Sequence, residues 1–186
     1  MTAPLAGDGF LLRRATEADV DFLVALASHE EVEPFMAAVA ARDRDELLEE
    51  VGRSEADPGH YGRLVVEVEG EPVGSLAFSV VNRRSRIAHL FAIMLDPAHR
   101  GRGLAAAATE LLVRHLVFEL NYHRVQLEVY GFNVRAIALF ERAGFVREGV
   151  RRRAYDRHGD WADGVLFGIV REDIEGAEPR APADAG

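Results

Sequence analysis

The chain has 186 residues, of which 48% are hydrophobic and 28% charged, which is typical of one soluble globular domain. It contains no cysteine, which excludes disulfides, thiolate metal sites and a cysteine nucleophile. The formal net charge of -9 argues against binding to nucleic-acid phosphates and would attract a cationic substrate, although an acidic balance also serves solubility alone.

The sequence predicts neither a membrane helix nor a secretory signal. No stretch approaches the ~20 consecutive apolar residues of a membrane helix, and residues 1–9 lack the basic start and apolar run of a secretory signal. We therefore expect no membrane insertion and a cytoplasmic location. Residues 175–186 are rich in Ala, Pro and Gly, so we expect a single domain over residues 1–174 followed by a disordered tail.

The first half of the sequence predicts a strand, several helices and a hairpin. Thr16 followed by Asp19 predicts a helix N-cap, and Pro34 suits the first turn of another helix. The expected elements are a strand at Phe10–Arg14, helices over residues 16–27, 34–41 and 43–52, and strands over residues 62–69 and 73–81.

The second half begins with a strand that is expected to be buried on both faces. Ile87–Leu95 is a short, continuous apolar run that ends at Asp96 and Pro97, a pattern typical of a central strand. Asn133 is a good helix N-cap and Gly144 a good C-terminal residue. The further expected elements are a helix over residues 104–120, a strand at Arg124–Tyr130, a helix at Val134–Arg142, and strands over residues 145–155 and 161–171.

A glycine-rich turn between the buried strand and the long helix is the most informative segment. It reads Arg100-Gly101-Arg102-Gly103-Leu104-Ala105. Glycines let the backbone approach a ligand closely, and the free amides at a helix start attract anions. The two arginines would add charge-assisted hydrogen bonds to phosphate. The turn therefore predicts a diphosphate site, the alternative being a plain tight turn with solvated arginines.

The same turn also satisfies the dinucleotide-binding pattern, with glycines at 101 and 103 and Ala106. That pattern normally follows the first strand of its unit and is followed, about 20 residues later, by an acid that holds the ribose. Here several expected strands precede the turn, and the next strand ends at Tyr130. A nucleotide-dependent oxidoreductase therefore stays only as an alternative.

Two motifs make the chain resemble the GNAT superfamily of N-acetyltransferases. Residues 96–105 are similar to the family's pyrophosphate loop, and residues 133–145 resemble its second cofactor motif. Residues 152–163 resemble the closing hairpin of the branch that acetylates ribosomal-protein alanine or spermidine. The resemblance covers most of the chain. It implies an α/β (α+β) fold with a mixed, mostly antiparallel sheet flanked by helices, whose fourth and fifth strands splay apart around the cofactor.

The resemblance also implies acetyl-CoA as the acyl donor, without a metal or a covalent enzyme intermediate. It implies cofactor contacts from the end of strand four, the glycine turn and the second motif, at Met94, Leu95, Arg100, Gly101, Arg102, Gly103, Leu104, Ala105, Asn133, Phe140 and Arg142. Alternatives remain for two of these residues, because Asn133 can simply cap its helix and Phe140 can simply fill the core.

The catalytic groups depart from the family's usual pattern. An alkyl ammonium must lose a proton before it can attack, and the family commonly uses a Glu on strand four where this chain has His89. A histidine with a pKa near ~6.5 can be that base, or it can be structural. Phe140 stands where a Tyr often protonates the leaving thiolate. The thiolate then leaves unprotonated, or water, Tyr130 or Tyr155 replaces that donor.

These observations predict an acetyl-CoA-dependent N-acetyltransferase acting by direct attack in a ternary complex. The acceptor is a primary amine: a protein N-terminus, a polyamine, or an amine-bearing metabolite or antibiotic. His29 and Glu33 lie in an acidic segment that could bind it, or that could be a solvated face. We expect no nucleic-acid or membrane partner, and a homodimer stays open. Because the usual Tyr is missing, a noncatalytic acyl-CoA-binding module is the other alternative.

Overall fold

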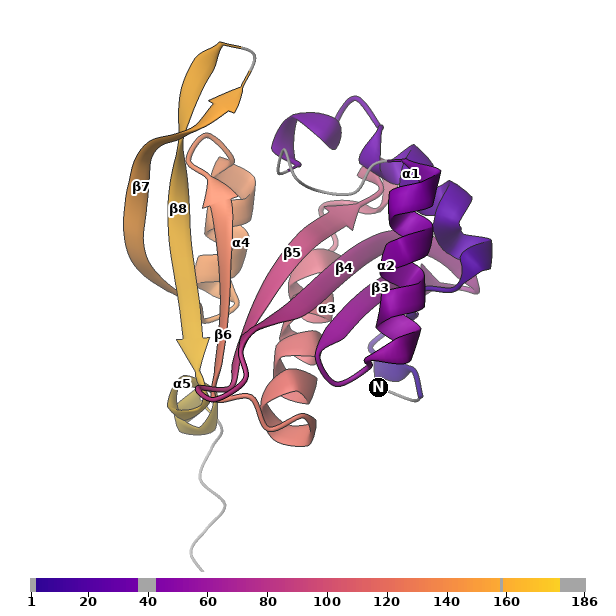
Figure 1. The fold of residues 1–186 in the computed structure, drawn as a ribbon, viewed down its shortest axis with the longest axis horizontal. Helices are drawn as coiled ribbons and strands as arrows, with labels where there is room; N and C mark the ends of the chain where they lie inside the picture. Colours follow the sequence, from indigo (N-terminus) through magenta and orange to yellow (C-terminus); the bar gives the residue numbers. More distant parts are fainter. Residues whose placement is uncertain (1–2, 37–42, 158, 178–186) are drawn as a thin grey trace, which may run out of the picture.

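The computed structural model describes residues 3–36, 43–157 and 159–177, which form one sheet with helices on both faces (Figure 1). The strands are β1 (Leu5–Gly7), β2 (Phe10–Arg14), β3 (Tyr61–Val68), β4 (Glu71–Asn82), β5 (Ile87–Leu95), β6 (Arg124–Tyr130), β7 (Val146–Arg157) and β8 (Asp160–Val170). The α-helices are α1 (Val20–Ala27), α2 (Arg44–Ala56), α3 (Leu104–Arg114), α4 (Val134–Arg142) and α5 (Arg171–Ala177). Short helical turns occur at η1 (Glu17–Asp19), η2 (Glu33–Phe35), η3 (Pro97–His99) and η4 (His115–Glu119).

The sheet has the order β1-β2-β3-β4-β5-β6-β8-β7. Every neighbouring pair is antiparallel except β5 and β6, which run parallel. A parallel pair needs a crossover connection, and α3 supplies it. The expected mixed, mostly antiparallel sheet is therefore confirmed. No helix in the described ranges is long and apolar enough to span a membrane.

The central strands β5 and β6 separate after a short paired stretch. Ile87, Ala88 and His89 pair with Arg124, Val125 and Gln126, and no later residue of β5 pairs with β6. Figure 1 shows the two strands diverging toward the end of β5 that leads to α3. Strands four and five of the predicted sheet correspond to β5 and β6, so the divergence leaves one edge of β5 without a strand partner.

A bulge interrupts β5 within the diverging part. Phe91 pairs with Ala77 of β4, whereas the next registered pair joins Met94 to Ser75, so β5 carries one extra residue. Ala92 takes up the irregularity with a left-handed φ of 47°. Bulges turn side chains and peptide groups out of the regular ladder, so the backbone around Ala92 is redirected where the strands part.

Two apolar layers hold the helices to the sheet. The larger core lies between the sheet and the pair α3 and α4, where Leu112, Leu116 and Phe140 are buried with Phe78 and Leu90. A smaller core joins α1 and α2 to the opposite face, which is the near face in Figure 1. A third cluster packs Val32 and Met36 against Met94 at the end of β5.

Several sequence expectations need correction. The helix expected over residues 34–41 is only the short turn η2, because Met36 is already extended with ψ of 138°, and residues 37–42 lie outside the described residues. The helix expected to end near Gly52 continues through Ala56. The long helix over 104–120 changes at His115 into the wider π-helical turn η4.

The end of the chain also differs from expectation. The last strand stops at Val170, and Arg171 begins α5, which includes the first residues of the expected disordered tail. Asp173 stabilises this start by accepting a hydrogen bond from the Val170 amide at 3.0 Å. Residues 178–186 lie outside the described residues. By contrast, β2, β5, β6 and α4 have the bounds that the sequence predicts.

Candidate active site

A cavity of about 650 Å³ lies between the diverging strands β5 and β6. Its wall combines the second half of β5, the glycine turn, the end of β6, the inner side of α4 and the η2 segment. The sequence-predicted residues that line it are His89, Met94, Leu95, Arg100, Gly101, Gly103, Leu104, Ala105, Tyr130, Asn133, Phe140, Arg142 and Tyr155. The fold thus brings most of the predicted site into one space.

The glycine turn presents backbone amides to one end of this cavity. Gly101 and Gly103 have φ values of 80° and 76°, in the left-handed region that favours glycine. Gly103 is the N-cap of α3, and the first hydrogen bond of that helix runs from the Ala107 amide to the Gly103 carbonyl at 3.0 Å. The amides of Leu104 and Ala105 therefore lack intrahelical acceptors and are available to an anion.

The space in front of the turn is open. A Cβ at Gly101 or Gly103 would meet no atom within 4 Å. The backbone of the turn is therefore the surface that a ligand would touch. This is the arrangement that a diphosphate needs, because its oxygens must reach peptide amides without a side chain between them.

The arginines around the turn have different environments. Arg100 donates to the Glu31 carboxylate at 2.9 Å and to the Glu31 carbonyl at 3.1 Å, so its charge is partly used within the protein. Arg102 is exposed and does not line the cavity. Arg135 of α4, which the sequence analysis did not single out, lines it together with Arg142. Arg135 lies near the start and Arg142 at the end of α4, and the amphipathic pattern of this helix could have indicated Arg135.

Asn133 and Phe140 both have the structural contacts that the sequence left open as alternatives, and both also line the cavity. The Asn133 side chain caps α4 by accepting a hydrogen bond from the Ala136 amide at 3.1 Å, and the residue also lines the cavity. Phe140 is 2% exposed and packs against Phe145 and Phe167, with ring centroids 5.7 and 6.1 Å apart, yet it too contributes to the lining.

His89, Tyr130 and Tyr155 lie in the other part of the cavity. The His89 ring is stacked at 6.4 Å on Phe91, and burial lowers the pKa of His89 below its usual value, an effect that the Glu128 charge opposes. The Tyr130 and Tyr155 rings meet edge to face at 5.5 Å. Burial and the neighbouring Glu128 carboxylate raise the pKa of Tyr155. At neutral pH this leaves an uncharged imidazole and a protonated phenol in one cavity.

Glu128 is a site residue that the sequence analysis missed. It lines the cavity, its side chain is 16% exposed, and its Oε1 accepts no hydrogen bond from the described residues. Its Oε2 lies 3.6 Å from a guanidinium nitrogen of Arg151. The alternating pattern of β6 could have indicated Glu128, because Gln126, Glu128 and Tyr130 face away from the apolar side of that strand.

His29 and Glu33 lie outside the cavity lining. The His29 ring accepts a hydrogen bond from the Glu31 amide at 3.1 Å. The Glu33 carboxylate lies 3.8 Å from Arg157, which also donates to the Pro34 carbonyl at 3.0 Å. The acidic segment is therefore linked to the β7–β8 hairpin. In the described ranges no group of three or more His, Asp and Glu residues is placed to hold a metal ion.

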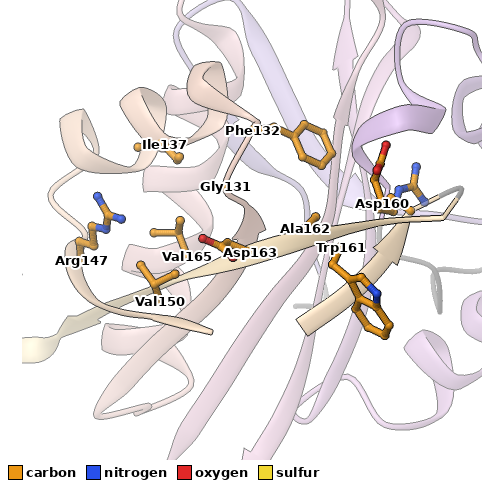
Figure 2. Close-up of a pocket in the computed structure, with 11 residues that line it drawn as sticks. Gly131, Phe132, Ile137, Arg147, Val150, Asp160, Trp161, Ala162, Asp163 and Val165 are labelled. Carbon is orange, nitrogen blue, oxygen red and sulfur yellow. The ribbon is translucent and has the colours of Figure 1, made fainter. Parts of the chain in front are cut away.

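A second depression, of about 660 Å³, lies between the start of α4 and the β7–β8 hairpin (Figure 2). It contains the exposed side chains of Phe132, Val150 and Trp161. None of the predicted catalytic, cofactor-binding or acceptor-binding residues lines it, and it contains no glycine turn at a helix start. The cavity between β5 and β6 is therefore the candidate active site.

Comparison with known proteins decides the family. Residues 23–145, about two thirds of the chain, match the acetyltransferase (GNAT) family. The chain belongs to that family. The resemblance inferred from the two cofactor motifs is confirmed, and the GNAT match includes β5, the glycine turn, β6 and α4 but ends before the β7–β8 hairpin that carries Tyr155.

The relatives of this GNAT protein include enzymes and uncharacterized proteins. The SPbeta prophage-derived uncharacterized N-acetyltransferase YokL of Bacillus subtilis (strain 168) is 31% identical over 112 residues, 60% of this chain and 63% of YokL. The match thus spans less than two thirds of that relative.

Solved structures support the fold. The spermidine N-acetyltransferase of Vibrio cholerae in complex with CoA and spermine has a TM-score of 0.81 at 24% identity, covering 91% of this chain and 99% of that one. The ribosomal-protein-S5-alanine acetyltransferase of Vibrio fischeri has a TM-score of 0.80 at 16% identity, covering 92% and 98%. At these identities the likeness concerns the fold, and it confirms the expected GNAT architecture.

Proposed function

We propose that this GNAT protein transfers an acetyl group from acetyl-CoA to a primary amine. The observation that carries the proposal is the shared cavity, in which the glycine turn lies at one end and His89, Glu128, Tyr130 and Tyr155 lie at the other. A cofactor with a diphosphate and a reactive acyl end would connect the two. Family membership supports the same conclusion.

The residues at the first end fit coenzyme A. The free amides of Leu104 and Ala105 and the open left-handed glycines suit its diphosphate, and the guanidinium groups of Arg135 and Arg142 add positive charge. The edge of β5 that lacks a strand partner leaves peptide groups available to the amide-containing pantetheine arm. Acetyl-CoA would supply the activated acyl group as a thioester. The CoA in the solved spermidine N-acetyltransferase supports this assignment.

The residues at the second end would handle protons. His89, whose lowered pKa leaves it uncharged at neutral pH, would accept a proton from the acceptor ammonium. The freed amine would attack the thioester carbon, forming a carbon–nitrogen bond and breaking the carbon–sulfur bond, and would lose its second proton. The departing thiolate would take one proton, and Tyr155, whose raised pKa keeps it protonated, would donate it. The products are the acetamide, CoA thiol and one released proton.

Two measurements test the proposal against its rivals. Acetyl-CoA and CoA should raise the melting temperature and NAD should not, because a ligand stabilises only the folded state that binds it. Thiol release from acetyl-CoA should then depend on an added primary amine. Stabilisation by NAD alone would support an oxidoreductase. Stabilisation by CoA without amine-dependent thiol release across a broad amine panel would support a noncatalytic binding module.

A further inference from the structure

The structure assigns the acceptor's ammonium group to Glu128, and we infer that the acceptor carries one ammonium on an apolar body rather than the several of a polyamine. This inference rests on the proposed function and deepens it. It follows from which carboxylates around the cavity are free to meet a cation and from what surrounds them.

Glu128 has the position that an ammonium-binding residue needs. Gln126 of β6 pairs directly with His89 of β5, so Glu128, two residues farther along β6, lies on the same face as His89. The charge of Glu128 acts on both His89 and Tyr155. An ammonium bound to this carboxylate would therefore lie beside the proposed proton acceptor.

The Glu128 carboxylate is buried but incompletely paired. Its Oε1 is shielded from solvent and accepts no hydrogen bond from the described part of the chain. Its contact with Arg151, at 3.6 Å, is longer than a hydrogen bond, and the Arg151 side chain is 60% exposed. Since a buried charge with few partners is costly, an incoming ammonium would gain a charge-assisted hydrogen bond to this carboxylate beyond the contacts that Tyr155 and Arg151 already make with it.

The neighbouring strand leaves room for this carboxylate. A Cβ built at Gly164 of β8 would lie 2.0 Å from Glu128 Oε1 and 2.8 Å from Cε2 of Tyr155. The glycine has an ordinary backbone conformation, because its φ lies outside the left-handed region. Its missing side chain is therefore what lets Glu128 and Tyr155 take their positions in the cavity wall.

The other carboxylates near the cavity are less well placed for a cation. Glu31, the second acid in the lining, pairs with Arg100 at 2.9 Å. Glu33 does not line the cavity. The sequence of residues 37–42, which lies outside the described ranges, contains no Asp or Glu. Among the described residues that line the cavity, Glu128 is thus the carboxylate left for a cation.

The remaining wall favours an apolar body beside that ammonium. Phe35, Tyr130 and Tyr155 line the cavity, and Phe132 links Phe35 to Tyr130 through ring contacts of 5.9 and 5.2 Å. Arg157 lies over the Tyr130 ring at 5.3 Å. Aromatic faces accept one cation and apolar carbon well, whereas the two guanidinium groups of Arg151 and Arg157 would repel a second ammonium. These features select against a polyamine.

The test compares a monoamine, 2-phenylethylamine, with spermidine in the wild-type protein and in two matched variants. Glu128→Gln keeps the shape and removes the charge. Glu148→Gln is the control, because Glu148 of β7 also pairs with an arginine, Arg124, but does not line the cavity. Thiol release gives kcat/KM for each amine. Calorimetry gives the affinity of each variant for acetyl-CoA, and of its CoA complex for the monoamine.

The wild type should use the monoamine at least roughly tenfold better than spermidine near neutral pH. Glu128→Gln should lower kcat/KM for the monoamine, and weaken its binding to the CoA complex, by roughly 10- to 100-fold, the size of a lost charge-assisted hydrogen bond. Acetyl-CoA affinity should stay unchanged in both variants, and Glu148→Gln should resemble the wild type.

A preference for spermidine, or monoamine binding that is equal in Glu128→Gln and wild type, would overturn the inference. If none of the amines supports thiol release, the proposed function is overturned instead. The calorimetric comparison would still test the role of Glu128 in that case, since it measures amine binding without chemistry.

Discussion

The two ends of the cavity are built in different ways. The end proposed to bind the cofactor consists mainly of backbone: two left-handed glycines, the first amides of α3 and the unpartnered edge of β5. The end proposed to bind the acceptor consists of side chains from β5, β6 and the β7–β8 hairpin. It lies near the η2 segment, which Arg100 and Arg157 contact.

This difference determines how each end tolerates substitution. A backbone site accepts almost any side chain around it, provided that the chain conformation and the open space are kept. A side-chain site fails when one functional group is lost or displaced by about an ångström. We therefore expect substitutions at the acceptor end to change turnover with little effect on CoA affinity. Substitutions at the cofactor end should mainly change CoA affinity.

The largest effect is expected at His89. His89→Gln keeps much of the side-chain size but cannot accept the proton, so kcat/KM should fall by roughly 10²-fold, the usual lower size of a general-base contribution. CoA affinity should not change. In the wild type, activity should rise with pH as the imidazole loses its proton, which gives the pH profile a rising limb. Because burial lowers the pKa of His89, the midpoint of this limb should lie below pH ~6.5. The limb should be absent from His89→Gln.

His115 provides the matched control for this experiment. Burial lowers the pKa of His115 as well, but the residue lies in η4 and does not line the cavity. His115→Gln should therefore keep the limb. A limb that persists in His89→Gln with near-normal turnover would show that His89 is structural. Amines of different pKa should be compared, because the ionisation of the acceptor adds a second limb at higher pH.

At the cofactor end, Gly103→Val should weaken CoA binding by roughly tenfold or more, a loss of about 1.4 kcal/mol. The branched side chain would occupy the open space in front of the α3 amides and would strain a residue with a φ of 76°. Isothermal calorimetry measures the affinity.

The Gly70→Val variant is the control that separates backbone strain from a lost contact with CoA. Gly70 also has a left-handed φ, of 87°, and an open Cβ position, but it does not line the cavity. Both variants should lose stability by about 1–3 kcal/mol, and only Gly103→Val should lose CoA affinity. Equal CoA affinity in folded Gly103→Val and Gly70→Val would contradict the diphosphate assignment.

A smaller effect is expected from displacing Glu128 without removing it. Gly164→Ala adds a Cβ that must push the Glu128 carboxylate and the Tyr155 ring aside, so kcat/KM for the amine should fall roughly three- to tenfold, as expected for misplaced binding groups. CoA affinity should stay the same.

Gly168→Ala is the matched control on the same strand. Its Cβ would lie 2.4 Å and 2.6 Å from the guanidinium nitrogens of Arg124, which pairs with Glu148 outside the cavity. The two substitutions displace similar ion pairs, so their melting temperatures should be similar. An equal loss of activity in both variants would indicate a general effect on the sheet and would count against a local role of Glu128.

The same difference explains how much could be predicted from the sequence. The bounds of β5, β6 and α4 and the glycine turn follow from local rules of apolar periodicity, capping and glycine conformation, and these rules need no tertiary contact. The family resemblance then predicted which end of the cavity would hold the cofactor. The fold and most of the cavity lining could therefore be predicted.

The acceptor end depends on contacts that the sequence order does not show. Arg100 reaches Glu31 across 69 positions, and Arg157 reaches the η2 segment across more than a hundred. The Glu128 carboxylate has room in the cavity wall because β6 pairs with β8, which brings Gly164 beside it. Pro34 suited a helix start, but the chain leaves helical geometry at Met36. Tertiary pairing decided each of these outcomes, and local propensity did not.

The smallest effect on turnover is expected at Phe140, which lies where the two ends of the cavity meet the core. Because Tyr155 already offers a protonated phenol in the cavity, Phe140→Tyr should change kcat by less than about twofold. Its hydroxyl would enter a ring cluster with Phe145 and Phe167 and would cost about 1–3 kcal/mol of stability if it found no hydrogen-bond partner there. Stopped-flow thiol release and thermal melts measure the two quantities.

Tyr155→Phe is the complementary variant, and it should lower kcat if Tyr155 protonates the thiolate. The opposite outcome would be that Phe140→Tyr raises kcat fivefold or more and also restores the kcat of the Tyr155→Phe variant. The proton donor would then be the residue at position 140 of α4 rather than a residue of the β7–β8 hairpin.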